Sequence, residues 1–194
     1  MVEAIGLLEL QSIAWGMDTA DVMVKAASVQ FIDTFMVTPG KYVVLVHGDP
    51  SAVDSSVQAG KAAAAEHVLD WLIIPFVHPQ VFPAIRNQAQ VQAIAALGLV
   101  ETASVATGIL SADRAAKAAN IQLLQLHLAR GIGGKSMLTL TGELVDVQAA
   151  VSAAESAAAA AGRLVAVRVV PNPHPDFAAR LLREAAPPVT DPGV

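Results

Sequence analysis

Hydrophobic and polar positions follow two alternating periods along this chain, and the whole succession occurs twice. Short, almost continuous apolar runs are typical of buried strands, and the stretches between them repeat apolar residues every three or four positions, as helices do. The first half predicts strands over 5–10, 30–37, 41–47 and 68–74, and helices over 19–27 and 50–65. The second half predicts strands over 97–102, 123–129, 135–141 and 164–170, and helices over 111–119 and 143–161.

Capping residues supply the expected helix ends. Thr19 and Ser111 offer a hydroxyl N-cap to the first helix of each half. Asp49-Pro50 supplies an N-cap and a first-turn proline, and Gly162 is a suitable residue to follow a helix. Each half therefore predicts the order β-α-β-β-α-β, an α+β fold with helices packed on an antiparallel sheet.

The two halves are copies of each other. At an offset of 92, residues 4–27 and 96–119 share 12 identities in 24 positions, among them two glycines, a glutamate and a lysine. After two slips of two residues, which loops tolerate, the offset becomes 94 and then 96. The later matches are Gly40-Lys41 with Gly134-Lys135, and Pro75, His78 and Pro79 with Pro171, His174 and Pro175.

The duplication predicts two homologous domains, residues 1–88 and 94–180. The polar stretch 86–93 is the natural linker between them. Residues 181–194 are expected to form a flexible C-terminal tail after a short helix, because the tail is rich in proline and ends in Gly193-Val194.

Composition narrows the classes of protein. The chain is 54% hydrophobic with a mean hydropathy of +0.53, yet no apolar run approaches the ~20 residues that a spanning helix needs. No secretory signal is recognisable, so we expect a cytoplasmic protein that binds no membrane. Only 15% of residues are charged, against about a quarter in ordinary domains, which predicts apolar surface in subunit interfaces.

Several kinds of site are excluded. With no cysteine, the chain has no disulfide, no thiolate nucleophile and no cysteine-ligated metal. A net charge of -5 gives no basic surface for nucleic acid. The five histidines are dispersed, so we expect no metal site and no cofactor.

The ordered motifs resemble the shell domain of bacterial microcompartments. In the first copy they are Gly6-Leu7-Leu8-Glu9-x-x-Ser12, Ala20-Asp21-x-x-x-Lys25-Ala26-Ala27 and Gly40-Lys41. The second copy repeats them as Gly98-Leu99-Val100-Glu101-Thr102-x-Ser104, Ala112-Asp113-x-x-x-Lys117-Ala118-Ala119 and Gly134-Lys135. The resemblance covers about residues 2–180 and is to the tandem, unpermuted type.

That resemblance implies a non-enzymatic shell subunit. Tandem members form homotrimers whose six domains imitate a hexagon and tile with other shell proteins around encapsulated enzymes. Metabolites would cross at a central pore, lined here by Thr38, Pro39 and Gly40 and by Arg130, Gly131, Ile132, Gly133 and Gly134. Some tandem members hold a cysteine-bound iron-sulfur cluster at that pore, a role excluded here. Arg130 near the mouth would favour anions.

Tile-edge contacts are expected at Lys25, Lys117, His78 and His174. A lone helical lysine is usually just solvated, but its repetition inside a matched frame favours the contact. Phe76 and Asn172 stand where the family usually has an arginine, which predicts an altered edge. We expect the side chains of the two histidines to be hydrogen-bonded within the fold, with a structural role.

Two motifs could suggest an enzyme, but neither is expected to form an active site. Gly134-Lys135-Ser136 mimics the end of a phosphate-binding loop, but a strand is predicted to follow where a helix is needed. Glu9 and Glu101 could suggest paired carboxylates, although each is expected to satisfy backbone or hydroxyl groups in its own domain. The alternative function is a soluble oligomer of the same fold that binds a small molecule or signals.

Overall fold

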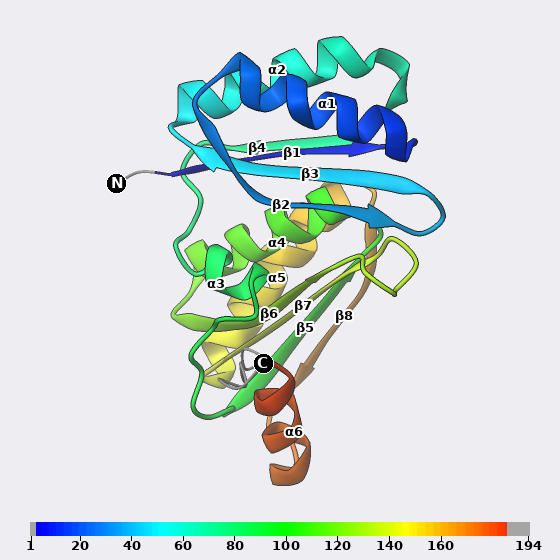
Figure 1. Ribbon diagram of the computed structural model, residues 1–194. Coiled ribbons are helices and arrows are strands. Elements are labelled where there is room, and N and C mark those ends of the chain that lie inside the picture. Colours follow the sequence, from blue (N-terminus) through cyan, green and yellow to red (C-terminus); the bar gives the residue numbers. More distant parts are fainter. Residues whose placement is uncertain (1–2, 186–194) are drawn as a thin grey trace, which may run out of the picture. The chain divides into compact units, whose positions relative to one another are not determined.

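The computed structural model describes residues 3–185, and in it the first sequence copy forms a four-stranded antiparallel sheet with two helices on one face (Figure 1). The strand order is β2-β3-β1-β4. The elements are β1 (Ala4–Leu10), α1 (Ile13–Ala26), β2 (Val29–Val37), β3 (Lys41–Gly48), α2 (Pro50–Ala64), the 3-10 turn η1 (Ala65–His67) and β4 (Val68–Ile74).

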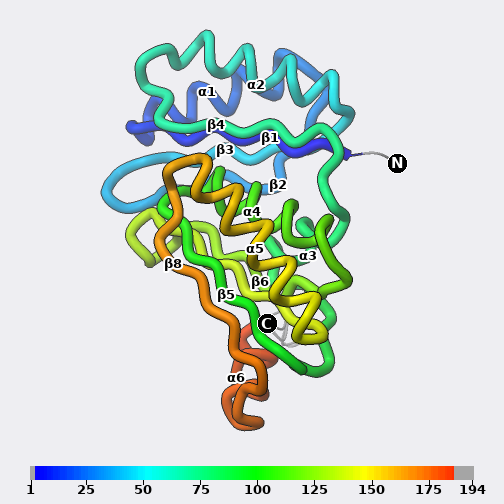
Figure 2. Tube along the Cα trace, turned by 180° about the vertical axis from the view of Figure 1, so that it is seen from behind, coloured from blue at the N-terminus to red at the C-terminus, as the bar shows by residue number. Residues whose placement is uncertain are grey.

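The second copy repeats this arrangement, with the strand order β6-β7-β5-β8. Helix α5 runs along β5 and β8 on one face of this sheet (Figure 2). The elements are β5 (Ala96–Thr102), α4 (Val105–Ala118), β6 (Ile121–Leu128), β7 (Ser136–Gly142), α5 (Leu144–Ala160) and β8 (Leu164–Val170). The predicted α+β class and the order β-α-β-β-α-β are confirmed in both copies.

By packing, the chain divides into two compact units whose limits differ from those of the copies. Of the described residues, the first unit comprises those up to Val77 together with Ala103–Leu110 and Leu128–Ser136. The second comprises His78–Thr102, Ser111–His127 and those from Met137 onward. The start of α4 and the turn between β6 and β7 therefore belong to the same compact unit as the first copy.

The core of the first copy lies between its sheet and its helices. Leu8 and Leu10 of β1 pack there with Met23 of α1 and with Val53 and Val57 of α2. The helix approaches the strand closely, because a Cβ atom added at Gly6 would stand 2.6 Å from Val57 Cγ2. The matching glycine of β5, Gly98, is equally confined, with Val151 Cγ2 of α5 at 2.8 Å.

The first helix of each copy begins about six residues before its predicted start. Ser12 is the N-cap of α1 and accepts a hydrogen bond from Trp15 N at 3.5 Å; Ser104 accepts one from Thr107 N at 3.2 Å. The predicted cap Thr19 is instead buried inside α1. The prediction was wrong because a buried hydroxyl within a helix has the same sequence signature as a cap.

The second helix of each copy ends as predicted. Asp49 caps α2 by accepting from Ser51 N at 2.9 Å and from the Ser51 hydroxyl at 2.6 Å. The hydrogen bond from the hydroxyl, and after it the one from the backbone N–H, lowers the pKa of the Asp49 carboxyl. After α5, Gly162 has a φ of 64°, a left-handed conformation that suits glycine. Arg163 N then reaches Ala158 O at 3.0 Å, so the final carbonyls of the helix are satisfied.

Two short helices follow the sheets. Helix α3 (Val81–Ile85) leads into the predicted linker, and α6 (Pro175–Ala185) follows β8. Residues 181–185 of the predicted flexible tail belong to helix α6, and residues 186–194 lie outside the described residues. The predicted domain limits therefore stay predictions.

Candidate functional site

Two hairpin turns carry the predicted pore residues. Thr38, Pro39 and Gly40 join β2 to β3 and are exposed. In the longer turn between β6 and β7, Arg130 to Gly133 are exposed and Gly134 is buried. The predicted strand, β7, follows this turn, where a phosphate-binding loop would need a helix.

The glycines in these turns are needed for their backbone conformation. Gly40, Gly131 and Gly133 have φ angles of 111°, 73° and 66°, which other residues adopt only with strain. No other described atom lies within 4 Å of where a Cβ would stand at any of the three. A side chain added there would consequently project into open space.

The two turns lie next to each other within the first compact unit. A Cβ at Gly134 would stand 3.7 Å from the carbonyl oxygen of Thr38 and 4.0 Å from Lys41 Nζ. These residues are almost a hundred positions apart in sequence. The fold thus brings together the two segments that the duplication made equivalent.

Arg130 makes specific contacts in the same unit. Its guanidinium forms an ion pair with Asp33 of β2 and lies over the ring of Phe35, 4.5 Å from the ring centroid. The pair is about half exposed, with 56% of the Arg130 side chain and 40% of the Asp33 side chain accessible. Asp33 therefore compensates much of the positive charge that the sequence predicts near this turn.

Behind the first turn lies a buried ion pair. Glu9 of β1 is 1% exposed, and its Oε1 accepts a hydrogen bond from Lys41 Nζ at 2.8 Å. Its other oxygen, Oε2, has no hydrogen-bond partner among the described residues. The expectation that Glu9 satisfies backbone or hydroxyl groups was wrong, because the partner that the fold supplies is an ammonium group one residue after the turn.

The predicted edge lysines form equivalent ion pairs one helical turn from an aspartate. Lys25 Nζ lies 2.5 Å from Asp21 on α1, and Lys117 Nζ lies 2.8 Å from Asp113 on α4. The aspartates differ in exposure, since the side chain of Asp21 is 55% accessible and that of Asp113 is 2% accessible. The repeated Asp-x-x-x-Lys motif is therefore at least a helical ion pair in both copies.

The predicted edge histidines adopt the same local turn. His78 Nδ1 accepts a hydrogen bond from Gln80 N at 3.4 Å, and His174 Nδ1 accepts one from Asp176 N at 3.3 Å. In addition, the backbone N–H of His78 donates to Asp113 Oδ1 at 2.8 Å. The contact with Asp113 was missed in the sequence, where nothing connects position 78 with position 113.

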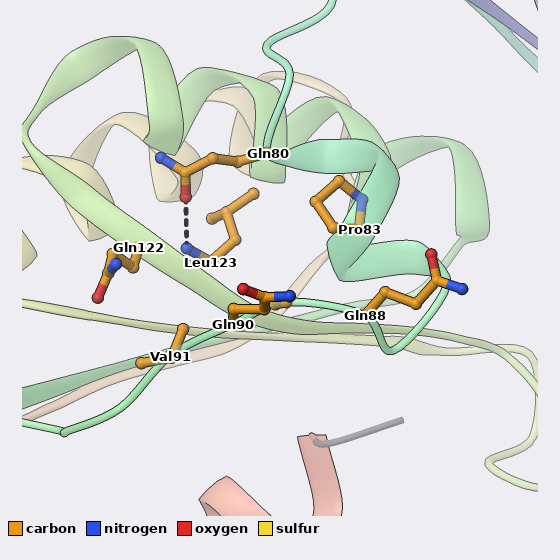
Figure 3. A pocket seen from close by; sticks show the side chains of 8 residues that line it. Gln80, Pro83, Gln88, Gln90, Val91, Gln122 and Leu123 are labelled. Carbon is orange, nitrogen blue, oxygen red and sulfur yellow. Dashed lines mark hydrogen bonds between the residues drawn. The ribbon is translucent and has the colours of Figure 1, made fainter. Parts of the chain in front are cut away.

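A pocket of about 440 Å³ lies beside β6 in the second compact unit (Figure 3). Its polar lining is uncharged and includes Gln88, Gln90 and Gln122. Both ends of the Gln80 carboxamide are hydrogen-bonded: its amide donates to Ile121 O at 2.9 Å and its oxygen accepts from Leu123 N at 2.8 Å. Gln80 thereby satisfies outward-facing backbone groups of the edge strand β6, a role that the sequence did not reveal.

Two other kinds of feature are absent from residues 3–185. No three His, Asp or Glu side chains in that range gather as metal ligands would. None of the helices in the described part of the chain has the length and apolar character to cross a bilayer.

Comparison with known proteins decides the family. The BMC domain profile matches residues 4–77 and again residues 96–173. The chain belongs to the BMC-domain family. Its tandem organisation, predicted from the duplication alone, is thereby confirmed.

Similar proteins have structural roles. The chain is 42% identical over 174 residues, 90% of its length, to the bacterial microcompartment shell protein PduT of Citrobacter freundii, of which 95% is covered. It is 38% identical over 88 residues to the carboxysome shell protein CsoS1 of Prochlorococcus marinus, covering 43% of this chain and 84% of that relative. This BMC-domain protein is accordingly a structural shell subunit of a bacterial microcompartment, and not an enzyme.

Solved structures agree with this assignment. A microcompartment protein from Desulfitobacterium hafniense superposes with a TM-score of 0.87 at 47% identity, covering 93% of this chain and 99% of that one. A fused permuted hexameric shell protein from the RMM microcompartment gives a TM-score of 0.59 at 25% identity, covering 81% and 82%. The present BMC protein has the unpermuted element order in both copies.

Proposed function

We propose that three copies of this shell protein close into a pseudohexameric ring whose central pore is lined by the β2–β3 and β6–β7 turns. The observation that carries this proposal is the adjacency of the two turns, with Gly134 beside Thr38 in one compact unit. Six similar domains from three chains can surround one axis, and two turns that neighbour each other in every chain then alternate around it.

The chemistry of the turns supports passage of small metabolites. The exposed glycines present backbone amides without side chains, so they leave room around an axis. Thr38 adds an exposed hydroxyl to the proposed lining, and Ile132 adds an exposed, large apolar side chain. Because Asp33 compensates Arg130, the lining would select by size and polarity more than by net charge.

Tiling is assigned to the outer edge of the ring. Lys25 and Lys117 carry ammonium groups that remain 73% and 38% accessible, as side chains, while paired with their aspartates. The imidazole side chains of His78 and His174 are assigned to the same edge, whereas the backbone N–H of His78 donates within the chain to Asp113. The partners are other copies of the ring, other shell proteins and the enzymes that the shell encloses.

Light scattering and electron microscopy test the proposal together. The protein in solution should have about three times the chain mass of 20.0 kDa. Overexpressed protein should form sheets or tubes of hexagonal tiles. A stable monomer would contradict the ring, and dispersed oligomers that retain a bound metabolite would favour the small-molecule-binding alternative.

A further inference from the structure

One junction between the two sequence copies is formed by contacts within a single chain. The segment that follows β4 places the N–H of His78 on the carboxylate of Asp113 in α4, at 2.8 Å. Two residues later, the carboxamide of Gln80 pairs with Ile121 O and Leu123 N on the outer edge of β6. Asp113 is almost completely buried by this junction and by Lys117.

The aspartate that accepts the His78 N–H has a twin in the first copy. Asp21 is the equivalent of Asp113, and it has the same i,i+4 lysine partner. Its side chain nevertheless remains 55% accessible, against 2% for Asp113. Lys25 is the only hydrogen-bond partner found for the Asp21 side chain within residues 3–185.

The receiving strand also has a twin. Strand β2 begins with Val29 N bonded to Ala27 O at 2.9 Å, just as β6 begins with Ile121 N bonded to Ala119 O at 3.0 Å. Both are edge strands of their sheets. Because Leu123 N is bonded from outside its sheet, we expect the equivalent N–H of Phe31 to face outward from the edge of β2, beside the register shift between Phe31 and Asp33.

The donor segment is duplicated as well. Residues 174–176 repeat the turn of residues 78–80, since in each the histidine Nδ1 accepts the N–H two residues later. The side chains of His174 and Asp176 are 74% and 95% accessible. Asp176 replaces Gln80, so its carboxylate can accept from a strand N–H but cannot donate to a strand carbonyl.

We propose that residues 174–176 of one chain bind Asp21 and the outer edge of β2 in the next chain, as residues 78–80 bind Asp113 and β6 within a chain. The N–H of His174 donates to the Asp21 carboxylate, and the carboxylate of Asp176 accepts from Phe31 N. This head-to-tail contact rests on the proposed ring, in which it would occur three times. This contact between chains has one hydrogen bond fewer than the junction within a chain, because Asp176 cannot donate to a strand carbonyl as Gln80 does.

Replacement of Asp21 tests the contact. In Asp21→Ala the association of chains, followed by sedimentation over a dilution series, should weaken by about tenfold to a hundredfold per contact, because a charge-assisted hydrogen bond is lost. Asp18→Ala is the matched control, because Asp18 is an exposed acid on the same helix outside the contact. Equal dilution curves for the two variants would overturn the proposal.

Cross-linking gives an independent measurement, because the chain contains no cysteine. Oxidised Asp21→Cys/His174→Cys should yield a ladder of linked chains, whereas the internal pair Asp113→Cys/His78→Cys should yield single chains only. If the Asp21→Cys/His174→Cys variant is trimeric when reduced but forms no ladder with an oxidant or with a short bis-maleimide, this contact is refuted. The trimeric mass would show that the ring itself is intact. A wild-type protein that is not trimeric would refute the ring itself.

Discussion

Replacing Lys41 with methionine removes the ammonium group that neutralises the buried Glu9 carboxylate. The two groups are 2.8 Å apart, and the Glu9 side chain is 2% accessible. Since Glu9 Oε2 has no other hydrogen-bond partner among the described residues, the carboxylate depends on Lys41. The variant would leave a charge inside the fold with neither water nor a counter-ion.

The expected loss follows from this geometry. Breaking one side of a buried ion pair costs about 3–5 kcal/mol, and the 31% accessibility of the Lys41 side chain favours the lower end, about 3 kcal/mol. Glu9→Met should cost less, about 1 kcal/mol, because the lysine left behind can reach water. The double variant Glu9→Met/Lys41→Met removes both charges and should be more stable than Lys41→Met alone.

Urea unfolding at one fixed chain concentration measures these differences, with Lys25→Met as the matched control. Lys25 is an exposed lysine in an ion pair, so its replacement should cost at most about 0.5 kcal/mol. If Lys41→Met is no more destabilising than Lys25→Met, Glu9 does not depend on Lys41. A double variant less stable than either single variant would refute the compensation argument.

Three further predictions concern the pore and the tile edge. Gly133→Trp should leave the trimer folded, because its Cβ has open space around it and the strain of a non-glycine residue at a φ of 66° costs only about 1–2 kcal/mol. The variant should slow the passage of small ions through assembled sheets of the protein, and unchanged passage would contradict the pore assignment. In the same assay Arg130→Glu should shift the ion preference away from anions, and salt should weaken the shift. Lys25→Ala with Lys117→Ala should preserve the trimer mass by light scattering while reducing sheets in electron microscopy. Loss of the trimer would instead place these lysines within the ring.

The strands could be predicted closely because local signals determine them. The limits of β4 and β8 coincide with the apolar runs, since these runs end at Pro75 and Pro171. Helix starts were harder, because Thr19 and Ser111 carry cap-like hydroxyls that the fold buries. Ser111 Oγ donates to Ala154 O at 3.3 Å, so its hydroxyl fastens α4 to α5.

The site was predictable only in part, because its contacts are not local. The turns and edge motifs could be located from the duplication, which makes equivalent residues visible. The partners of Arg130 and His78 could not, since Asp33 and Asp113 are distant in sequence and have no local pattern that identifies an acceptor. Those partners depend on how the segments pack, which periodicity does not determine.

The difference between the copies gives the tandem chain a property that six identical domains could not have. At the offset of 92, Asp33 corresponds to Gln125 and Arg130 corresponds to Thr38. The ion pair between Asp33 and Arg130 therefore takes one residue from each copy. The reverse combination, Gln125 of the second copy with Thr38 of the first, carries no charge. In the proposed ring, junctions within a chain would carry the ion pair, while junctions between chains would carry the neutral pair. The pore surroundings would then alternate three times around the axis, and this alternation follows from divergence after duplication.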